Sequence, residues 1–269
     1  MIISISKYLA VLRTNWIQAL EYRANAIVGL VAIVSGLFIE YQIWDLIFKT
    51  KGVSTINGFT FNELIVFIYL SIVVGQLKSS WHTSTQMIRD IRNGDMNKYL
   101  IRPISYFAYN LMMFIGVNSL YYTAYTIMLI LFVIIFPGLL FTTIISACGF
   151  LLALVLSIYL SYCIYFMMIC FSFWFGEVRS LVISYNLAML VLSGQYIPIR
   201  FFPKWILNIL NWTPIKYLVD FPVSIATGLL PQDQWLNNFL LAISWCIILS
   251  ILCVLIYKKG IRNYEAYGS

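Results

Sequence analysis

The chain of 269 residues offers few side chains that could carry out covalent chemistry. His82 is its only histidine, and no carboxylate or cysteine stands at metal-ligand spacing from it. Ser193-Gly194 lacks the strand-turn-helix context of a nucleophile elbow. No Gly-x-x-x-x-Gly-Lys-Ser/Thr phosphate loop occurs, so the chain does not hydrolyse ATP by that route. We therefore expect no catalytic residue, no metal site and no cofactor in this chain.

The remaining functional candidates are polar groups inside apolar segments. An acidic side chain in such a segment raises the free energy of insertion into a membrane, so its presence there suggests a function. Glu40 lies deep in the first apolar segment, whereas Asp45 and Glu63 fall near segment ends. Glu40 either lines a path for a substrate or pairs with a neighbour or reaches the interface. Tyr122 and Tyr125 lie inside a long apolar run, where they either line such a path or pack between helices.

Membrane-embedded helices are needed to position these candidates. The chain is 62% hydrophobic and 10% charged, with a mean hydropathy of +0.88, whereas soluble domains carry about 25% charged residues. It is therefore predicted to be an integral membrane protein, surrounded by a lipid bilayer. The basic residues behind the net charge of +7 are then expected to set the orientation in the membrane and to contact anionic lipid. We expect no nucleic-acid partner.

A transmembrane helix needs about 20 apolar residues, and the sequence supplies six such runs in one all-α domain, residues 1–269. The predicted spans are Ala26–Phe48, Phe61–Trp81, Tyr106–Phe136, Leu139–Phe175, Leu181–Ile199 and Trp235–Tyr257. Pro137-Gly138 separates the third span from the fourth, and a further break within residues 106–175 stays open. Residues 1–25 contain the amphipathic stretch Ile2–Glu21, which is predicted to lie as an interfacial helix on the inner surface.

Orientation follows from the distribution of Lys and Arg. With the N-terminus inside, twelve of the 17 basic residues fall in inner segments and five fall in outer segments. Both termini are therefore predicted to be cytoplasmic.

Residues 82–105 form the longest polar interval beyond the N-terminal segment. Residues 86–93 can form a short amphipathic helix that Gly94 closes as a C-cap. Its expected apolar side is Met87, Ile88 and Ile91, and its expected exposed side is Arg89, Asp90 and Arg92. A second apolar patch, Tyr99-Leu100-Ile101, runs into Arg102-Pro103. The loop is either a docking surface for a cytoplasmic protein or an ordinary positive-inside loop, and composition does not decide between them.

Residues 200–231, between the fifth and sixth predicted spans, are apolar but broken by prolines. Pro203 and Pro214 suit first-turn positions of short helices, and Gly228 suits a C-cap. We predict a re-entrant helical hairpin that dips partway into the bilayer from the outer side, with a surface-lying loop as the alternative.

Two short-range arrangements of charges are also expected. Asp220 should pair with Lys216 at i, i+4 spacing. Glu177 and Arg179 should form a short inner turn, for which contact with a partner protein is the alternative.

Four features together resemble the permease subunits of type-2 ABC exporters, over nearly the whole chain. The first two are Glu21-Tyr22-Arg23-Ala24-Asn25 at the end of the interfacial helix, and the loop with Asp90-Ile91-Arg92-Asn93-Gly94-Asp95 and Tyr99-Leu100-Ile101-Arg102-Pro103-Ile104-Ser105. The others are Leu192-Ser193-Gly194-Gln195-Tyr196-Ile197-Pro198 followed by Phe202-Pro203, and Trp212-Thr213-Pro214 before a short helix that ends at Gly228.

The resemblance implies an exporter permease that forms the translocation path and whose coupling helix docks on a separate ATPase, which would bind ATP and Mg. It also implies a dimer with a second permease, identical or different, in a bacterial cytoplasmic membrane. The implied coupling residues are Met87, Ile88, Arg89, Ile91, Arg92, Gly94 and Arg102. The candidates for the path are Glu40, Tyr122, Tyr125 and Gln195, and the implied outer gate hairpin is marked by Pro198, Pro203, Pro214 and Gly228.

Two other functions are compatible with such a fold. One is a non-transporting membrane scaffold or sensor, for which an ATPase partner would be absent. The other is an intramembrane lipid-modifying enzyme, which would need clustered His, Asp, Glu or metal ligands within the spans. No motif specifies the substrate, or distinguishes export from lipid extraction.

Overall fold

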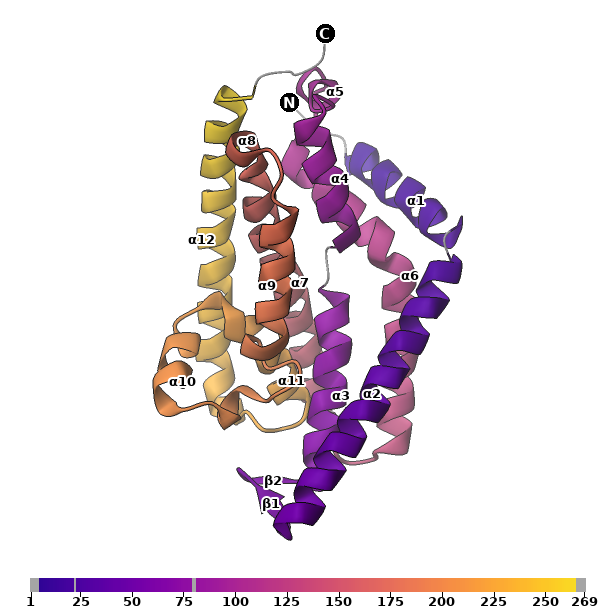
Figure 1. Ribbon diagram of the computed structural model, residues 1–269, viewed down its shortest axis with the longest axis vertical. Coiled ribbons are helices and arrows are strands. Elements are labelled where there is room, and N and C mark those ends of the chain that lie inside the picture. The colour runs from indigo at the N-terminus through magenta and orange to yellow at the C-terminus, as the bar shows by residue number, and fades with distance from the viewer. Residues whose placement is uncertain (1–4, 22, 79–80, 265–269) are drawn as a thin grey trace.

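The computed structural model describes residues 5–21, 23–78 and 81–264. It is an elongated bundle of helices (Figure 1). The first half contains α1 (Ile5–Glu21), α2 (Arg23–Lys51), β1 (Thr55–Ile56), β2 (Phe59–Thr60), α3 (Phe61–Leu77), α4 (Trp81–Arg92), α5 (Asn97–Leu100) and α6 (Tyr106–Ile135). The second half contains α7 (Ile144–Cys170), α8 (Ser172–Phe175), α9 (Arg179–Leu192), η1 (Ile199–Phe201), α10 (Lys204–Asn211), η2 (Pro214–Leu218), α11 (Asp220–Ala226), η3 (Gln232–Gln234) and α12 (Trp235–Arg262).

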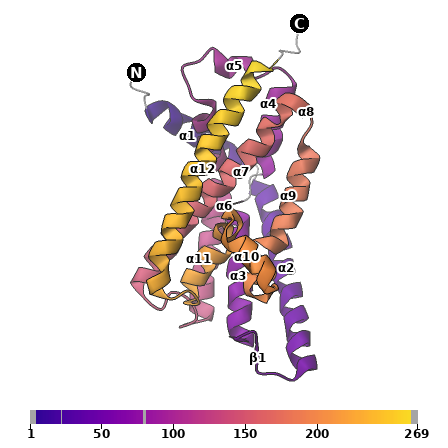
Figure 2. The same cartoon turned by 90° about the vertical axis from the view of Figure 1, so that its left-hand side faces the viewer.

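The two ends of the bundle carry different elements. The start of α1 and the end of α12 lie at the same end as α4 and α5, and the β1–β2 hairpin lies at the opposite end (Figures 1 and 2). The chain therefore brings its N-terminal helix, the 82–105 segment and its last helix together, as the predicted topology requires. Residues 2–4 of the predicted interfacial helix, and Tyr22, lie outside the described residues.

Within the described ranges, four helices are long and apolar enough to cross a membrane. They are Ile27–Lys51, Tyr106–Ile135, Ile144–Phe175 and Gln232–Arg262. The apolar helices α3 and α9 have 17 and 14 residues, so they rise only about 26 and 21 Å, against a hydrocarbon core of about 30 Å. The structure thus supports four spans, and the count of six stays a prediction.

The second predicted span is broken rather than continuous to Trp81. α3 ends at Leu77, and α4 begins at Trp81 and leads on toward the end that carries α5 (Figure 1). At the break, the Lys78 carbonyl accepts a hydrogen bond from Ser161 Oγ on α7, 2.9 Å away. In a continuous helix this carbonyl would accept a backbone hydrogen bond. Because Ser161 supplies a donor instead, the carbonyl is not left unpaired inside the bundle.

The fifth predicted span ends at Leu192 and not at Ile199. Gly194 adopts a positive φ of 86°, and the Tyr196 amide donates to the Leu190 carbonyl over 3.2 Å. This is the geometry by which a glycine closes a helix. The apolar composition of residues 195–199 masked the stop, because hydropathy does not report backbone conformation.

The fourth predicted span begins at Ile144 rather than Leu139. The predicted split at Pro137-Gly138 is confirmed, since α6 ends at Ile135 and Gly138 has a φ of 82°. The residues that follow form a loop, in which the Phe141 amide donates to the Ala226 carbonyl at the end of α11, 2.9 Å away. The loop is therefore anchored to the 200–231 segment.

A two-stranded hairpin interrupts the predicted all-α fold. Thr55 pairs with Thr60 and Ile56 with Phe59, around Asn57-Gly58, which both have positive φ. Asn-Gly between short apolar runs is a strong hairpin signal, and the sequence analysis overlooked it. The ring of Phe59 is buried and lies 5.9 Å from that of Phe201 in η1, so the hairpin packs against the 200–231 segment.

The closest helix contact in the first half joins α1 to α6 at Gly116. A Cβ at this position would lie 2.8 Å from the Leu12 carbonyl oxygen and 2.8 Å from Asn15 Cβ. The absence of a side chain therefore allows the α1 backbone to approach α6, as small residues do between membrane helices. The opposite side of α1 leaves Leu9 and Ile17 exposed.

We predict that Gly116→Ala separates α1 from α6, because the nearest obstacle is backbone and cannot rotate away. The cost should be about 1–3 kcal/mol, measured as a lower unfolding temperature of the purified protein in detergent. Gly36→Ala is the matched control, since a Cβ there meets nothing within 4 Å. Equal unfolding temperatures for the two variants would show that the contact at Gly116 is unimportant.

Candidate coupling surface and translocation path

The apolar side of α4 is buried within the chain itself. Met87, Ile88 and Ile91 are all buried, and α4 packs against α6, α7, α8 and α9. These three side chains are therefore covered by the chain itself, and the prediction that they contact a partner stays a prediction. An amphipathic pattern shows that a helix has an apolar face, but it does not show whether a partner or the same chain covers it.

Asp90 was predicted to be exposed, and this was also wrong. Its carboxylate is buried and accepts hydrogen bonds from Lys98 Nζ at 3.1 Å and from Tyr99 OH at 3.2 Å. Burial, and then the nearby Asp90 carboxylate, raise the pKa of the Tyr99 phenol, so Tyr99 remains the donor. The contact fastens α5 to α4.

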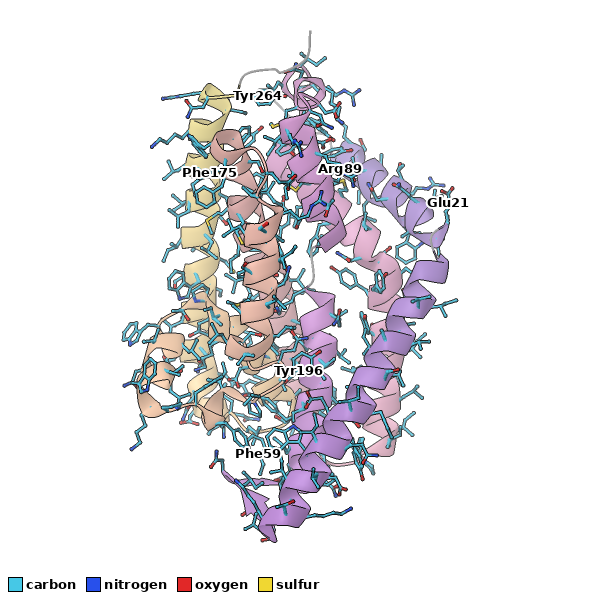
Figure 3. The ribbon with its side chains drawn as sticks, in the orientation of Figure 1. Glu21, Phe59, Arg89, Phe175, Tyr196 and Tyr264 are labelled. Carbon is cyan, nitrogen blue, oxygen red and sulfur yellow. The ribbon has the colours of Figure 1, made fainter. Side chains whose placement is uncertain are left out.

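Gly94 closes α4 as predicted, with a φ of 82°. The reversal that follows lets the Met96 amide donate to the Asp90 carbonyl over 3.1 Å, with the Met96 side chain fully buried. Arg89 and Arg92 are exposed, again as predicted. Figure 3 labels Arg89 on α4, between α1 and the end of α12.

Residues 100–103, which we call the apex, are the exposed part of the segment. Leu100 is 46% exposed and Ile101 is 84% exposed, and Arg102 and Pro103 are exposed beside them. The apex follows α5 at the tip of the bundle (Figure 1). The apex thus exposes two apolar side chains beside Arg102, whereas most other apolar side chains of the segment are buried. We therefore take the apex, and not the α4 face, as the candidate docking surface.

Three elements brace the segment around the apex. Arg92 Nη1 forms an ion pair with Glu177 Oε2 at 3.0 Å, from the turn between α8 and α9. The Ser105 amide donates to Tyr8 OH of α1 over 3.1 Å. Tyr106 stacks on Tyr257 of α12 with ring centroids 5.6 Å apart. The predicted turn at Glu177 and Arg179 is confirmed, since the Arg179 amide donates to Glu177 Oε1.

The four candidates for a translocation path do not gather in one place. Glu40 on α2 lies beside Trp44 and close enough to Tyr69 and Tyr196 to act on them electrostatically. Figure 3 shows Tyr196 in the lower half of the bundle, among α2, α3 and α9. Glu40 has no ion-pair partner among the described residues.

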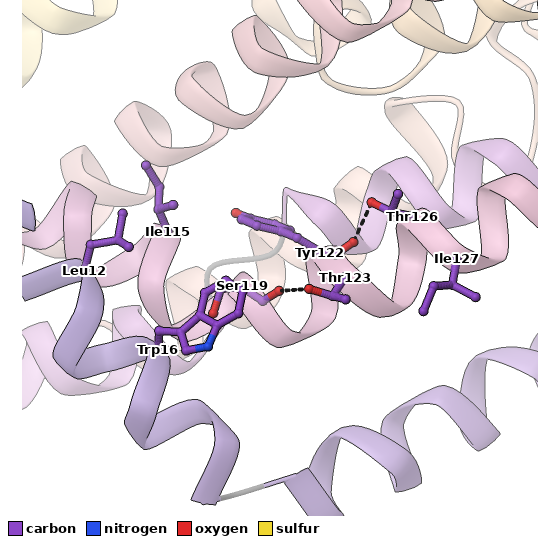
Figure 4. Close-up of a pocket in the computed structure, with 8 residues that line it drawn as sticks. All are labelled: Leu12, Trp16, Ile115, Ser119, Tyr122, Thr123, Thr126 and Ile127. Atoms are coloured by element: carbon purple, nitrogen blue, oxygen red, sulfur yellow. Dashed lines mark hydrogen bonds between the residues drawn. The ribbon is translucent and has the colours of Figure 1, made fainter.

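Tyr122 and Tyr125 lie on α6 and have different surroundings. Tyr125 is buried and stacks on Tyr121 at 6.2 Å. Tyr122 lines a cavity of about 410 Å³ between α1 and α6, together with Leu12 and Trp16 (Figure 4). The rest of its lining is Ile115, Ser119, Thr123, Thr126 and Ile127. Whether any of these residues lines a transport path stays a prediction.

Gln195 lies on the other side of α3. Its side chain packs directly on Gly75, where a Cβ would approach within 2.3 Å of the amide. It lines a second cavity, of about 250 Å³, with residues of α3, α7 and α9. Tyr122 and Gln195 thus line two different cavities, and Glu40 lines neither of them.

The 200–231 segment folds into short helices, with local signals as predicted. Pro203 precedes the first turn of α10, Pro214 opens η2 after Thr213, and Gly228 follows α11 with a φ of 69°. Pro198 precedes η1. Each of the seven residues of α11 is buried, and α11 packs against α7, whereas α10 exposes Trp205 and Ile209. The position of the 200–231 segment relative to a bilayer stays a prediction, and so does the re-entrant hairpin.

The expected ion pair between Lys216 and Asp220 does not form. Lys216 Nζ donates to Asn238 Oδ1 on α12 at 3.2 Å, and Asp220 is buried with Oδ1 unpaired in the described part of the chain. Burial raises the pKa of Asp220 to about 6, although the positive charges of Lys216 and Arg200 oppose the shift. The i, i+4 spacing applies to continuous helices, and here η2 ends before α11 begins.

The arrangement as a whole is that of a multi-pass helical membrane protein, with a braced apex at one end and a partly buried group of short helices toward the other. Residues 33–268 match the family described as ABC-2 family transporter protein. Since this match covers most of the chain, the chain belongs to that family, and it is a membrane permease component of a transporter. No curated protein matches the chain.

Besides Asp90, sequence reasoning missed the burial of Lys78, which it had assigned only to an inner segment. Lys78 is 6% exposed at the break between α3 and α4. A lysine so close to the end of an apolar run, followed by Ser79-Ser80, was the available signal for a break.

We predict that Asp90→Ala loosens the apex, because Tyr99 OH and Lys98 lose their acceptor. The free energy of unfolding should fall by about 1–3 kcal/mol, measured by thermal unfolding in detergent. Limited proteolysis should then cut residues 94–103 faster. Asp95→Ala removes an exposed carboxylate from the same turn and should behave as wild type. If both variants resist protease equally, Asp90 does not anchor the apex.

We also predict a pH dependence from Asp220. Its pKa rises from 3.8 to about 6 on folding, so between about pH 4 and 6 the unfolded chain ionises while the folded chain keeps the proton. Stability should therefore fall as pH rises through this window, by at most about 3 kcal/mol. Asp220→Asn should lose this slope and Asp233→Asn, an exposed control, should keep it. Parallel pH profiles for wild type and Asp220→Asn would refute the assignment.

Proposed function

We propose that this permease forms the translocation path of an ATP-driven exporter and couples to a separate ATPase through its apex. The observation that carries the proposal is the exposure of Leu100 and Ile101 at the tip of a braced segment. An apolar pair of this kind, beside Arg102, fits a cleft with an apolar floor and an acidic rim. The ATPase would bind ATP and Mg, because this sequence contains no phosphate loop.

The braces explain how a movement of the ATPase would reach the spans. A push on the apex acts on α6 through Ser105, whose side chain caps that helix. It acts on α12 through the stacked rings of Tyr106 and Tyr257, and on α9 through the ion pair of Arg92 with Glu177. Rigid contacts of this kind transmit a rigid-body movement. Met87, Ile88 and Ile91 serve as the internal anchor of this lever, and not as its outer contact.

The assembly is proposed to contain a second permease, identical or different, in a bacterial cytoplasmic membrane with the apex on the cytoplasmic side. The apolar side chains exposed on α2, among them Val31, Val34 and Phe38, are available to lipid or to that second permease. The short helices of residues 200–231 would close the outer end of the path.

The rival functions receive less support. Among the described residues, no group of three or more His, Cys, Asp or Glu side chains could hold a metal ion, and the acidic groups of the spans are dispersed. A scaffold or sensor would use the same fold without an ATPase, so detection of a bound ATPase is the observation that separates it from an exporter.

We predict that Ile101→Asp weakens binding of the ATPase, because it places an unpaired carboxylate in an apolar contact. Such a charge costs several kcal/mol, so the affinity should fall at least about tenfold. The measurement is co-purification of the ATPase, with ATP hydrolysis of the complex assayed in parallel. Val53→Asp is the matched control, because Val53 is also exposed but lies at the opposite end, beside β1. Retention of the ATPase and of full activity by Ile101→Asp would contradict the proposal.

A further inference from the structure

Lys78 is a buried cation at the end of α3. It caps α3, its amide donates to the Val74 carbonyl, and its own carbonyl accepts from Ser161 Oγ on α7. The backbone of Lys78 is thus fixed on both sides, and its side chain is 94% removed from solvent, being only 6% exposed. It cannot leave this environment without a change in the break itself.

The described part of the chain gives the Lys78 ammonium no acidic partner. The acidic residues that form ion pairs there are Asp45, Asp90 and Glu177, and each pairs with another cation. A buried charge is stable only when it is paired or hydrogen-bonded. Lys78 is therefore a buried cation that forms no ion pair within the described residues.

The space beside Lys78 is a cavity of about 250 Å³, between α3, α7, α9 and the turn that follows α9. Gln76 and Gln195 bring amide groups to its lining, and Gly75 leaves room for the Gln195 side chain. Asn186 and Tyr165 form another wall, where Tyr165 OH donates to Asn186 Oδ1 and Asn186 Nδ2 donates to the Val182 carbonyl. Lys78, Gln76 and Gln195 thus line one space, to which the described residues contribute no acidic side chain.

The remaining lining is apolar and comes from α9, as Leu187, Met189 and Leu190. Leu187 is exposed on the surface of the bundle, so the cavity opens beside an apolar face. The volume is below the roughly 300–1,000 Å³ of sites that enclose drug-sized ligands. It suits the headgroup of an amphiphile whose apolar part stays outside, along α9.

We propose that Lys78, Gln76 and Gln195 form a binding site for a phosphate group, carried by an anionic lipid or by another amphiphile. The ammonium pairs with the phosphate oxygens, and the amide NH₂ groups of the two glutamines donate to them. The site is distinct from the apex and requires no ATPase. Failure to find it would leave the proposed transport function intact, and failure to find an ATPase partner would leave this site intact.

The test is lipid binding to the full-length protein, purified in neutral detergent and followed by native mass spectrometry. The probes are dioleoyl phosphatidylglycerol, dioleoyl phosphatidylcholine and inorganic phosphate. Wild type should bind phosphatidylglycerol more tightly than phosphatidylcholine, and Lys78→Gln should weaken phosphatidylglycerol binding about tenfold or more. Lys78→Arg should keep most of the preference, and Lys258→Gln, an exposed basic control on α12, should keep all of it.

A second variant separates binding from folding. Gln195→Glu places a carboxylate in the cavity that Lys78 also lines, so it should pair with the ammonium and abolish the preference for phosphatidylglycerol while the protein stays folded. Thermal unfolding without lipid should be unchanged or improved in this variant. Competition by millimolar inorganic phosphate would identify a free phosphate as a ligand of the same site. Unaltered phosphatidylglycerol binding in both Lys78→Gln and Gln195→Glu, or equal binding of the two lipids by wild type, would overturn the proposal.

Discussion

The burial of one face of α4 is the interaction on which the end of the molecule that carries α4 and α5 depends (Figure 1). Met87, Ile88 and Ile91 pack among α6, α7, α8 and α9, and Asp90 fastens the following turn through Tyr99 and Lys98. Since the anchor is internal, the segment cannot pivot freely about its two connections. Ile101 and its neighbours are consequently held out at the tip, where a rigid protrusion can transmit force.

A second constraint concerns the backbone of the broken segments, which must find hydrogen-bond partners inside the bundle. Serines of α7 supply them at two breaks: Ser161 Oγ donates to the Lys78 carbonyl, and Ser157 Oγ donates to the Leu218 carbonyl of η2. α7 also packs against α11 and α12. It therefore acts as the helix that supplies partners to irregular backbone inside the bundle, and Lys78 and Gln195 line one cavity there.

The sequence predicted correctly where several helices end, but it predicted poorly which side chains are buried. Gly94, Pro137-Gly138, Pro214 and Gly228 were assigned correctly, because glycine and proline act on the backbone locally. The exposure of Asp90 was assigned incorrectly, because it depends on the residues that fold over it, among them Lys98 and Tyr99. Likewise, Lys216 was expected to bind a neighbour in sequence and instead contacts Asn238, 22 residues away. The family explains the architecture, whereas the exposed apolar surface of the 82–105 segment lies at the apex and not on the helix face that the sequence indicated.

The central claim is that the apex, and not the surface of α4 or the opposite end, touches the ATPase. The most direct measurement places a photo-crosslinking amino acid at Ile101, at the exposed α4 position Gln86, and at Val53, and irradiates membranes that contain the assembled transporter. The account predicts a crosslink to the ATPase from position 101, with a weaker one or none from position 86 and none from position 53. Crosslinks from position 86 or 53 without one from position 101 would contradict it.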